Sequence, residues 1–229
     1  MSSALELAWS TPPAWAEAAL AEPLALLSDH AHCELGAASA AQGLLVRRPE
    51  QAELVERLSA HALDELRHFK RVHRLLVELG GALAPVRRSP YAEGLLARAE
   101  RGPSHLLERL LIAGLIELRS LERFQLLARH ARTLAGGQPG LAELYEELAP
   151  SEEGHARLFL ELARDAFGAA AVAERWPRWL AREAELVQGL AFGPRIHSGP
   201  PAGPPAGPGR NDAPALQGER DPVEKELHA

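Results

Sequence analysis

Two short segments of the sequence carry a glutamate followed three residues later by a histidine. They are Glu65 with His68, in HALDELRHF, and Glu152 with His155, in PSEEGHARLF. On a helix this spacing places both side chains on one face, and none of the other eight of the ten histidines has a glutamate at that distance. Two Glu-x-x-His helices, with one glutamate from each of two further helices, bind a pair of iron or manganese ions in four-helix bundles. The repeated motif therefore predicts a two-metal site.

Two further glutamates lie on the apolar faces of other helical segments. Glu34 shares its face with small apolar residues, namely Leu27, Ala31, Ala38 and Ala41. Glu117 lies on the face formed by Leu107, Leu110, Gly114, Leu121 and Phe124. The nearby Glu122 belongs to a flanking face. Because a lone carboxylate on an apolar face is costly unless it is paired, we expect Glu34 and Glu117 to complete the metal site.

The predicted ligand set supplies four carboxylates and two imidazoles, one group of ligands from each of four helices. The set is Glu34, Glu65, His68, Glu117, Glu152 and His155. Its four negative charges balance two ferrous ions, and mixed nitrogen and oxygen donors suit iron or manganese. The four glutamates are also the predicted catalytic residues.

Several nearby residues receive secondary predictions. Asp64, which precedes Glu65, is expected to orient His155 through a hydrogen bond. Tyr145 lies on the face of Glu152, as a core tyrosine or a neighbour of the metal ligands, and the core role is preferred. We expect the remaining histidines of the helical region to be at the surface or hydrogen-bonded; these are His30, His32, His61, His73, His105 and His130.

The spacing of apolar residues predicts helices almost throughout the chain. Four long ones are expected at 23–46, 49–79, 103–134 and 141–167, with shorter additional helices at 14–20, 91–101 and 171–190. The long connection between the second and third core helices predicts an all-α, ferritin-like bundle rather than an up-down-up-down bundle. We expect one helical domain over residues 1–192 and a disordered tail over 193–229, which is rich in Pro and Gly.

The composition narrows the class of protein. One cysteine excludes an internal disulfide and a cysteine-built zinc or iron–sulfur site. No segment has the pattern of a secretion signal or a membrane span, so a cytoplasmic protein is expected. The net charge of −6 argues against non-specific coating of nucleic acid, although it permits a local basic patch.

Five segments together resemble the tRNA 2-methylthio-N6-isopentenyladenosine hydroxylases, a family of ferritin-like non-haem di-iron monooxygenases. They are DHAHCELGAA, ALDELRHF, GLIELRSLERF, LAPSEEGHARLF and RIHSGP, and the similarity extends over about residues 5–200. The resemblance implies that the six residues above bind two iron ions. It also implies that O2 and two electrons from a partner hydroxylate the isopentenyl group of a modified adenosine beside the tRNA anticodon.

Other functions remain open at this point. A ferritin-like ferroxidase would form a cage, whereas the proline-rich tail favours a monomer or small oligomer. A rubrerythrin-like peroxidase normally has a cysteine-ligated iron domain, which one cysteine cannot build. A di-iron oxygenase acting on a lipid or small molecule differs only in lacking tRNA binding. For tRNA contacts the candidates are Arg47 with Arg48 and, preferred, Arg87 with Arg88 in the long connection, followed by Arg98 and Arg101.

Overall fold

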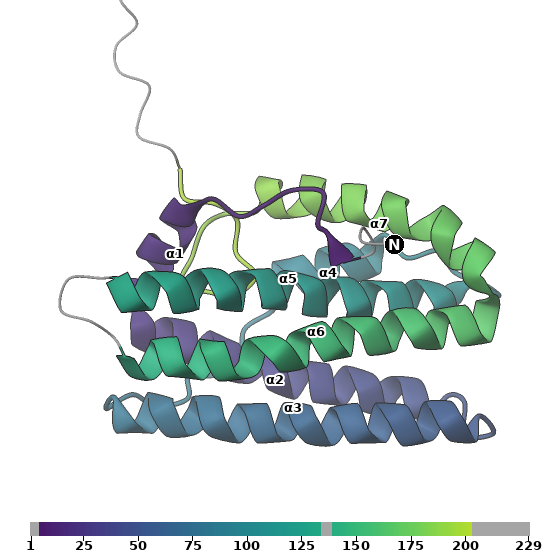
Figure 1. Cartoon of the computed structure of the whole chain (residues 1–229), viewed down its shortest axis with the longest axis horizontal. Helices are drawn as coiled ribbons and strands as arrows, with labels where there is room; N and C mark the ends of the chain where they lie inside the picture. The colour runs from purple at the N-terminus through teal and green to yellow at the C-terminus, as the bar shows by residue number, and fades with distance from the viewer. Residues whose placement is uncertain (1–4, 134–138, 203–229) are drawn as a thin grey trace, which may run out of the picture.

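The computed structural model describes residues 5–133 and 139–202, and within these ranges it contains seven α-helices and no strand (Figure 1). The helices are α1 (Pro13–Leu20), α2 (Pro23–Leu45), α3 (Ala52–Glu78), α4 (Pro90–Ala97), α5 (His105–Thr133), α6 (Pro139–Phe167) and α7 (Ala169–Gly189). No helix in the described part of the chain has an apolar stretch long enough to cross a membrane.

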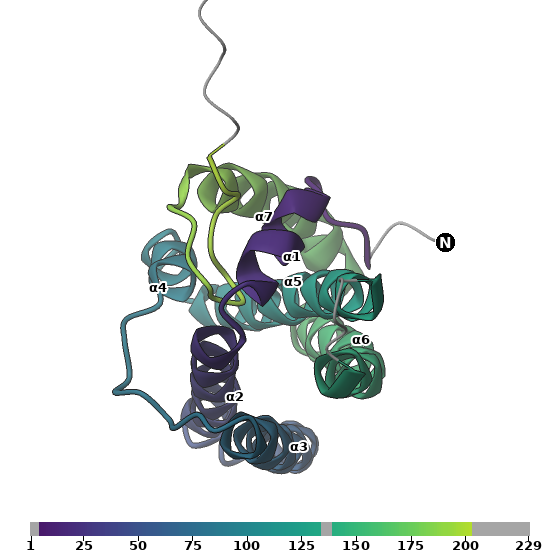
Figure 2. The same ribbon diagram turned by 90° about the vertical axis from the view of Figure 1, so that its left-hand side faces the viewer.

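Four long helices form the core as two hairpins. Helix α2 packs along α3, α5 packs along α6, and the hairpins meet where α3 contacts α6. The connection from α3 to α5 runs along the outside of the bundle and includes α4 (Figure 2). Because of this long connection, α5 begins at the end of the bundle where α2 turns into α3. The predicted ferritin-like four-helix bundle is confirmed.

The helix boundaries follow local chemistry. Proline occupies the first turn of α2 and α4, where its missing N–H costs nothing, and the Ser89 side chain accepts a hydrogen bond from the Ala92 N–H to cap α4. Gly168, with φ of 85°, separates α6 from α7, since this backbone conformation is strained for other residues. The additional helix expected over 91–101 is shorter in the structure and ends at Ala97.

A buried network of charges attaches the additional segments to the core. Arg119 on α5 forms two hydrogen bonds of 2.7 Å with Glu183 on α7, and it also donates to Glu122 and to the Trp9 carbonyl. Tyr91 on α4 donates to the same Glu183 at 2.9 Å. Each of these buried charges has several partners, so the network holds α4, α7 and the N-terminal arm against α5.

Residues 193–199 differ from the expected tail because they pack into the bundle. The Ile196 side chain is fully buried, its N–H donates to Asp29 at 3.0 Å, and its carbonyl accepts from Arg123 at 2.8 Å. A Cβ at Gly199 would lie 1.7 Å from the Leu190 carbonyl oxygen, so the turn back from α7 needs glycine. The helical domain therefore extends beyond the expected boundary at residue 192. Residues 203–229 of the expected tail lie outside the described residues.

Two truncations test this boundary. Deleting 193–229 removes the buried Ile196 and leaves the Arg123 guanidinium without its carbonyl acceptor, so we expect the melting temperature to fall by about 5 °C. Deleting only 203–229, which contains few apolar residues, should leave it unchanged. Differential scanning fluorimetry measures both. Equal melting temperatures for the two truncated proteins would show that 193–202 contribute nothing.

Candidate metal centre

The six predicted ligands, one set from each core helix, converge in the middle of the bundle. His155 Nδ1 lies 2.8 Å from Glu65 Oε1, and His68 Nδ1 lies 3.5 Å from both Glu34 Oε2 and Glu152 Oε1. All six side chains are buried. The i to i+3 spacing on α3 and α6 places Glu and His on the same side of each helix. Helix packing directs that side toward the interior of the bundle.

Close approach of two helices brings Glu117 to the same place. A Cβ added at Gly114 on α5 would lie 3.2 Å from the Phe159 Cβ on α6, so glycine allows the two helices to pack tightly one turn before Glu117. Glu117 then faces the first hairpin, where its Oε1 lies 3.6 Å from His61 Nε2. The flanking Glu122 instead pairs with Arg119, as the helical face predicts.

The chemistry of this cluster fits a pair of metal ions. Glu65, His68, Glu152 and His155 each offer a ligand atom, and these atoms lie within 4.8 Å of one another. Within the described residues, one ligand atom of each of the four is buried without a hydrogen-bond partner: Glu65 Oε1, His68 Nδ1, Glu152 Oε1 and His155 Nδ1. Buried polar atoms without partners are rare, and here they face each other around one point. Cations bound among them would satisfy these atoms.

Without metal ions, several carboxyl groups of the cluster have raised pKa values and therefore tend to hold protons. Burial and the neighbouring carboxylates raise the pKa of Glu65 and of Glu152 well above the usual range, and burial raises the pKa of Glu117 to about 7. Burial and the charge of His68 lower the pKa of His155 to about 4, so this imidazole is neutral at neutral pH. A metal ion binds neutral imidazoles directly and displaces the protons that such carboxyl groups hold. The protonation of this cluster therefore suits metal binding.

Two of the histidines that we expected at the surface or hydrogen-bonded lie beside these ligands. His30 is hydrogen-bonded, as expected, whereas His61 is buried without a hydrogen-bond partner in the part of the chain that the structure describes. His30 Nε2 lies 2.5 Å from Glu34 Oε1, and His61 Nδ1 lies 3.3 Å from Glu65 Oε1. Burial raises the pKa of Glu34, but the charge and hydrogen bond of His30 outweigh it and hold this pKa well below its usual range. Each histidine precedes a predicted ligand by four residues, which is one helical turn. That spacing is a signal in the sequence from which both histidines could have been placed beside the ligands.

Two secondary predictions have different outcomes. Asp64 is partly exposed and pairs with Arg67 at 2.5 Å, so it does not form the expected hydrogen bond with His155. Being one residue before Glu65 turns it toward solvent. Tyr145 is a buried core residue, as preferred, and its ring stacks on His30 with centroids 5.5 Å apart.

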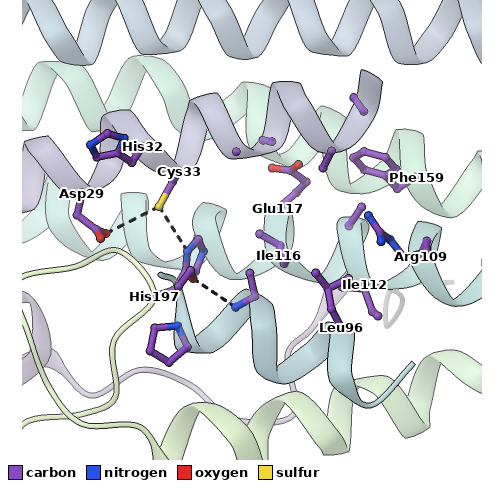
Figure 3. A pocket seen from close by; sticks show the side chains of 18 of the residues that line it. Asp29, His32, Cys33, Leu96, Arg109, Ile112, Ile116, Glu117, Phe159 and His197 are labelled. Carbon is purple, nitrogen blue, oxygen red and sulfur yellow. Dashed lines mark hydrogen bonds between the residues drawn. The ribbon is translucent and has the colours of Figure 1, made fainter. Parts of the chain in front are cut away.

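A cavity of about 330 Å³ leads from this cluster to the surface between α2, α5 and the α3–α5 connection. Figure 3 shows Glu117 pointing into it, with Asp29, Cys33 and His197 toward one end and Arg109 toward the other. Most of its wall is apolar and includes small residues of α2 and larger ones of α5 and α6: Gly36, Ala37, Ala40, Ala41, Ile112, Ile116 and Phe159. Arginines also line it, namely Arg87, Arg109 and Arg195.

The packed C-terminal segment forms one wall of the cavity. The His197 ring stacks on Tyr91 at 4.7 Å, its Nε2 lies 3.1 Å from Ser120 Oγ, and its Nδ1 lies 3.8 Å from Cys33 Sγ. Burial and the charges of Arg123 and Arg119 lower its pKa to about 3, so the ring is neutral at neutral pH. The RIHSGP segment thus fixes the polar end of the cavity, although its composition alone suggested a tail.

Comparisons with known proteins agree with this geometry. Residues 3–198 match the family model described as tRNA-(MS[2]IO[6]A)-hydroxylase (MiaE). A Pseudomonas putida protein named tRNA 2-(methylsulfanyl)-N(6)-isopentenyladenosine(37) hydroxylase is 38% identical over 193 residues, covering 83% of this chain and 91% of that protein. A Salmonella typhimurium protein with the same name is 30% identical over 155 residues, covering 67% of this chain and 55% of that protein.

A solved structure is similar over most of the chain. It is described as Protein 43 with aldehyde deformylating oxygenase activity from Synechococcus. The TM-score is 0.78 and the sequence identity 36%, with coverage of 85% of this chain and 96% of that one.

The raised pKa of Glu117 predicts a pH-dependent cost in the metal-free protein. Because its folded-state pKa of about 7 exceeds the usual 4.5, folding is favoured at low pH, and this contribution is lost as pH rises through 7. The ionised carboxylate then costs about 3 kcal/mol. Most of this cost arises between pH 5 and pH 7. We expect Glu117→Gln, measured with a chelator present, to melt clearly higher than the wild type at pH 8 and only slightly higher at pH 5.

The control is Glu56→Gln, which changes an exposed glutamate of α3 in the same way and should melt like the wild type at both pH values. An advantage of Glu117→Gln that is the same at pH 5 and pH 8 would contradict the assignment of the cost to ionisation.

Proposed function

Because the chain belongs to the tRNA-(MS[2]IO[6]A)-hydroxylase family, we propose that it is a non-haem di-iron monooxygenase acting on tRNA. Its substrate is 2-methylthio-N6-isopentenyladenosine beside the anticodon, and the product carries a hydroxyl on the isopentenyl group. One oxygen atom of O2 enters that group. The other leaves as water, which requires two electrons from an external donor and two protons.

One observation carries this proposal: a mostly apolar cavity has Glu117 and His61 of the metal centre on its wall and arginines beside them. An isopentenyl chain suits the apolar wall near Glu117, since burying its carbon atoms there is favourable. A nucleotide in RNA also brings phosphates, which suit the guanidinium groups of Arg87, Arg109 and Arg195. A cavity with both features fits a prenylated nucleotide better than a purely apolar molecule.

The six ligands would hold the two iron ions, which supply the activation of O2 when bound. Glu34, Glu65, Glu117 and Glu152 would neutralise the four positive charges of the ferrous pair, which makes burial of the whole cluster tolerable. The rest of the work is positioning. Phe159 and Ile112 line the same cavity as Glu117, so a substrate chain bound against them would displace water from the reacting side of the centre.

A second candidate rests on the Synechococcus protein, which is 36% identical and has aldehyde deformylating oxygenase activity by its description. An apolar cavity also accepts an aliphatic aldehyde. The arginines beside the cavity favour the nucleotide, because an uncharged aldehyde gains little from them. A ferroxidase is less well supported, because iron oxidation needs no organic cavity beside the metal centre.

Hydroxylation is tested directly with the full-length protein. After anaerobic reconstitution with ferrous iron and chemical reduction, we expect about two irons per chain. Added tRNA carrying the prenylated nucleoside should gain one oxygen atom from 18O2, detected by nucleoside mass spectrometry. Glu65→Ala and His155→Ala should each bind less iron and form no product, because each removes a ligand from the centre of the cluster. Full iron content and turnover in both variants would refute the site, whereas conversion of an aldehyde but not of tRNA would favour the second candidate.

Binding of tRNA is tested at the α3–α5 connection. Arg87 lines the cavity, and Arg88 is next to it, exposed and 3.8 Å from Glu93. We expect the double variant Arg87→Glu with Arg88→Glu to bind tRNA more weakly and to lower the slope of log K against log salt by about one to two, because phosphate contacts are lost. Iron content should not change.

The matched control reverses two charges elsewhere. Arg157→Glu with Arg178→Glu alters exposed arginines of α6 and α7 that do not line the cavity. It should bind tRNA like the wild type. If both double variants lose affinity equally, the effect comes from net charge and the connection has no special role.

A further inference from the structure

His61 lies inside the metal centre, although it is not one of the six predicted ligands. It is 2% exposed, its Nδ1 lies 3.3 Å from Glu65 Oε1, and its Nε2 lies 3.6 Å from Glu117 Oε1. Neither nitrogen has a hydrogen-bond partner in the described structure. An imidazole with two buried, unsatisfied nitrogens is costly, because both have lost their bonds to water without replacement. This cost is removed if one nitrogen binds a metal ion.

The surroundings of the ring hold it in place for such a role. His155 and Phe159 on α6 pack against it edge to face, with ring centroids 4.4 and 4.9 Å away. On α3 it is one turn before Glu65, so both side chains project in the same direction. Ligand atoms of His61, Glu65 and Glu117 lie within 4.8 Å of one another, and all three residues are buried. Residues of α3 and α5 therefore bring three potential metal ligands together at one place.

We propose that His61 is a seventh protein ligand of the metal pair, binding the ion that it shares with Glu65 and Glu117. The proposal rests on the proposed function only in that the centre holds two metal ions. A neutral imidazole adds a nitrogen donor without charge, so the balance of four carboxylates against two divalent ions is kept. The two metal positions then differ, because one receives His68 alone and the other receives His61 together with His155.

His30 provides an internal comparison. It also precedes a predicted ligand by four residues, but its Nε2 already bonds to Glu34 Oε1 at 2.5 Å, and its ring is covered by Phe124 and Tyr145. His30 therefore positions Glu34. His61 has no such bond, and unlike His30 it lines the cavity. The ion bound by His61 and Glu117 is accordingly the one on the cavity side, where the substrate enters.

Cobalt substitution tests the ligand directly, because the visible spectrum of Co²⁺ depends on the number and type of its ligands. Full-length wild type, His61→Ala and His73→Ala are loaded with Co²⁺ and titrated. His73→Ala is the control, since it removes a partly exposed histidine of the same helix. We expect the wild-type spectrum in the control, and in His61→Ala a changed spectrum with binding of one of the two ions at least about tenfold weaker.

Free imidazole provides a rescue experiment. Removing the His61 side chain enlarges a cavity that opens to solvent, so added imidazole can occupy the vacated position. It should restore the wild-type spectrum in His61→Ala and have no effect on the control. Restoration would show that a nitrogen donor is missing, which a general loss of packing would not produce.

A measurement on the unaltered protein remains decisive if His61→Ala does not fold. In the Co²⁺ form, each ligating histidine gives a hyperfine-shifted, exchangeable N–H signal in the proton NMR spectrum. We expect three such signals, from His61, His68 and His155. Two signals, or an unchanged spectrum and affinity in folded His61→Ala, would overturn the proposal while leaving a two-metal centre intact. Failure of the wild type to bind two ions would instead contradict the proposed function.

Discussion

The structure depends on burying four carboxylates and their histidine neighbours between four helices. Removing a charged carboxylate from water is expensive, and the helices bring Glu34, Glu65, Glu117 and Glu152 to one place. Without cations the cluster must hold protons, as the raised pKa values of Glu65, Glu117 and Glu152 indicate. Two divalent ions would remove that cost. Bound metal ions would therefore stabilise the bundle as well as supply its chemistry.

A second buried network shows what satisfied charges look like in the same protein. Arg119 and Glu183 share two hydrogen bonds of 2.7 Å, and Tyr91, Thr11 and Glu122 complete the network. The charges of this pair are matched by protein partners, so the pair needs no ligand. At the candidate metal centre one ligand atom each of Glu65, His68, Glu152 and His155 has no hydrogen-bond partner within the described residues. This contrast between two buried polar clusters is the physical reason to assign structure to one and chemistry to the other.

The irregular segments have a clear role in this arrangement. The α3–α5 connection contributes Val86, Arg87 and Ser89 to the wall of the cavity, and the C-terminal segment contributes Arg195 and His197. This C-terminal segment is fixed by Asp29, Arg123 and Trp15, which bond to the Ile196 N–H, the Ile196 carbonyl and the Ser198 hydroxyl. The polar end of the cavity therefore belongs to a rigid part of the molecule.

Local spacing in the sequence was sufficient to predict the helices, their order and the convergence of six side chains. This succeeded because the helical repeat decides which residues share a face, so Glu65 and His68 can be paired without knowing the fold. The same reasoning missed His61 and His30, although both stand one turn before a predicted ligand. That spacing could have placed both histidines beside the ligands, but their burial depends on how α5 and α6 pack against them, which spacing within one helix does not determine.

Tertiary structure alone decided the position of residues 193–199 and the shape of the cavity. A stretch rich in Pro and Gly has too little apolar surface to predict docking, yet Ile196 is buried because Asp29 and Arg123, from distant helices, satisfy its backbone. Asp64 was misplaced for a related reason, since its nearest partner is the exposed Arg67 on its own helix. Contacts within one turn of helix follow from sequence spacing, whereas contacts between helices depend on how each is rotated when the core packs.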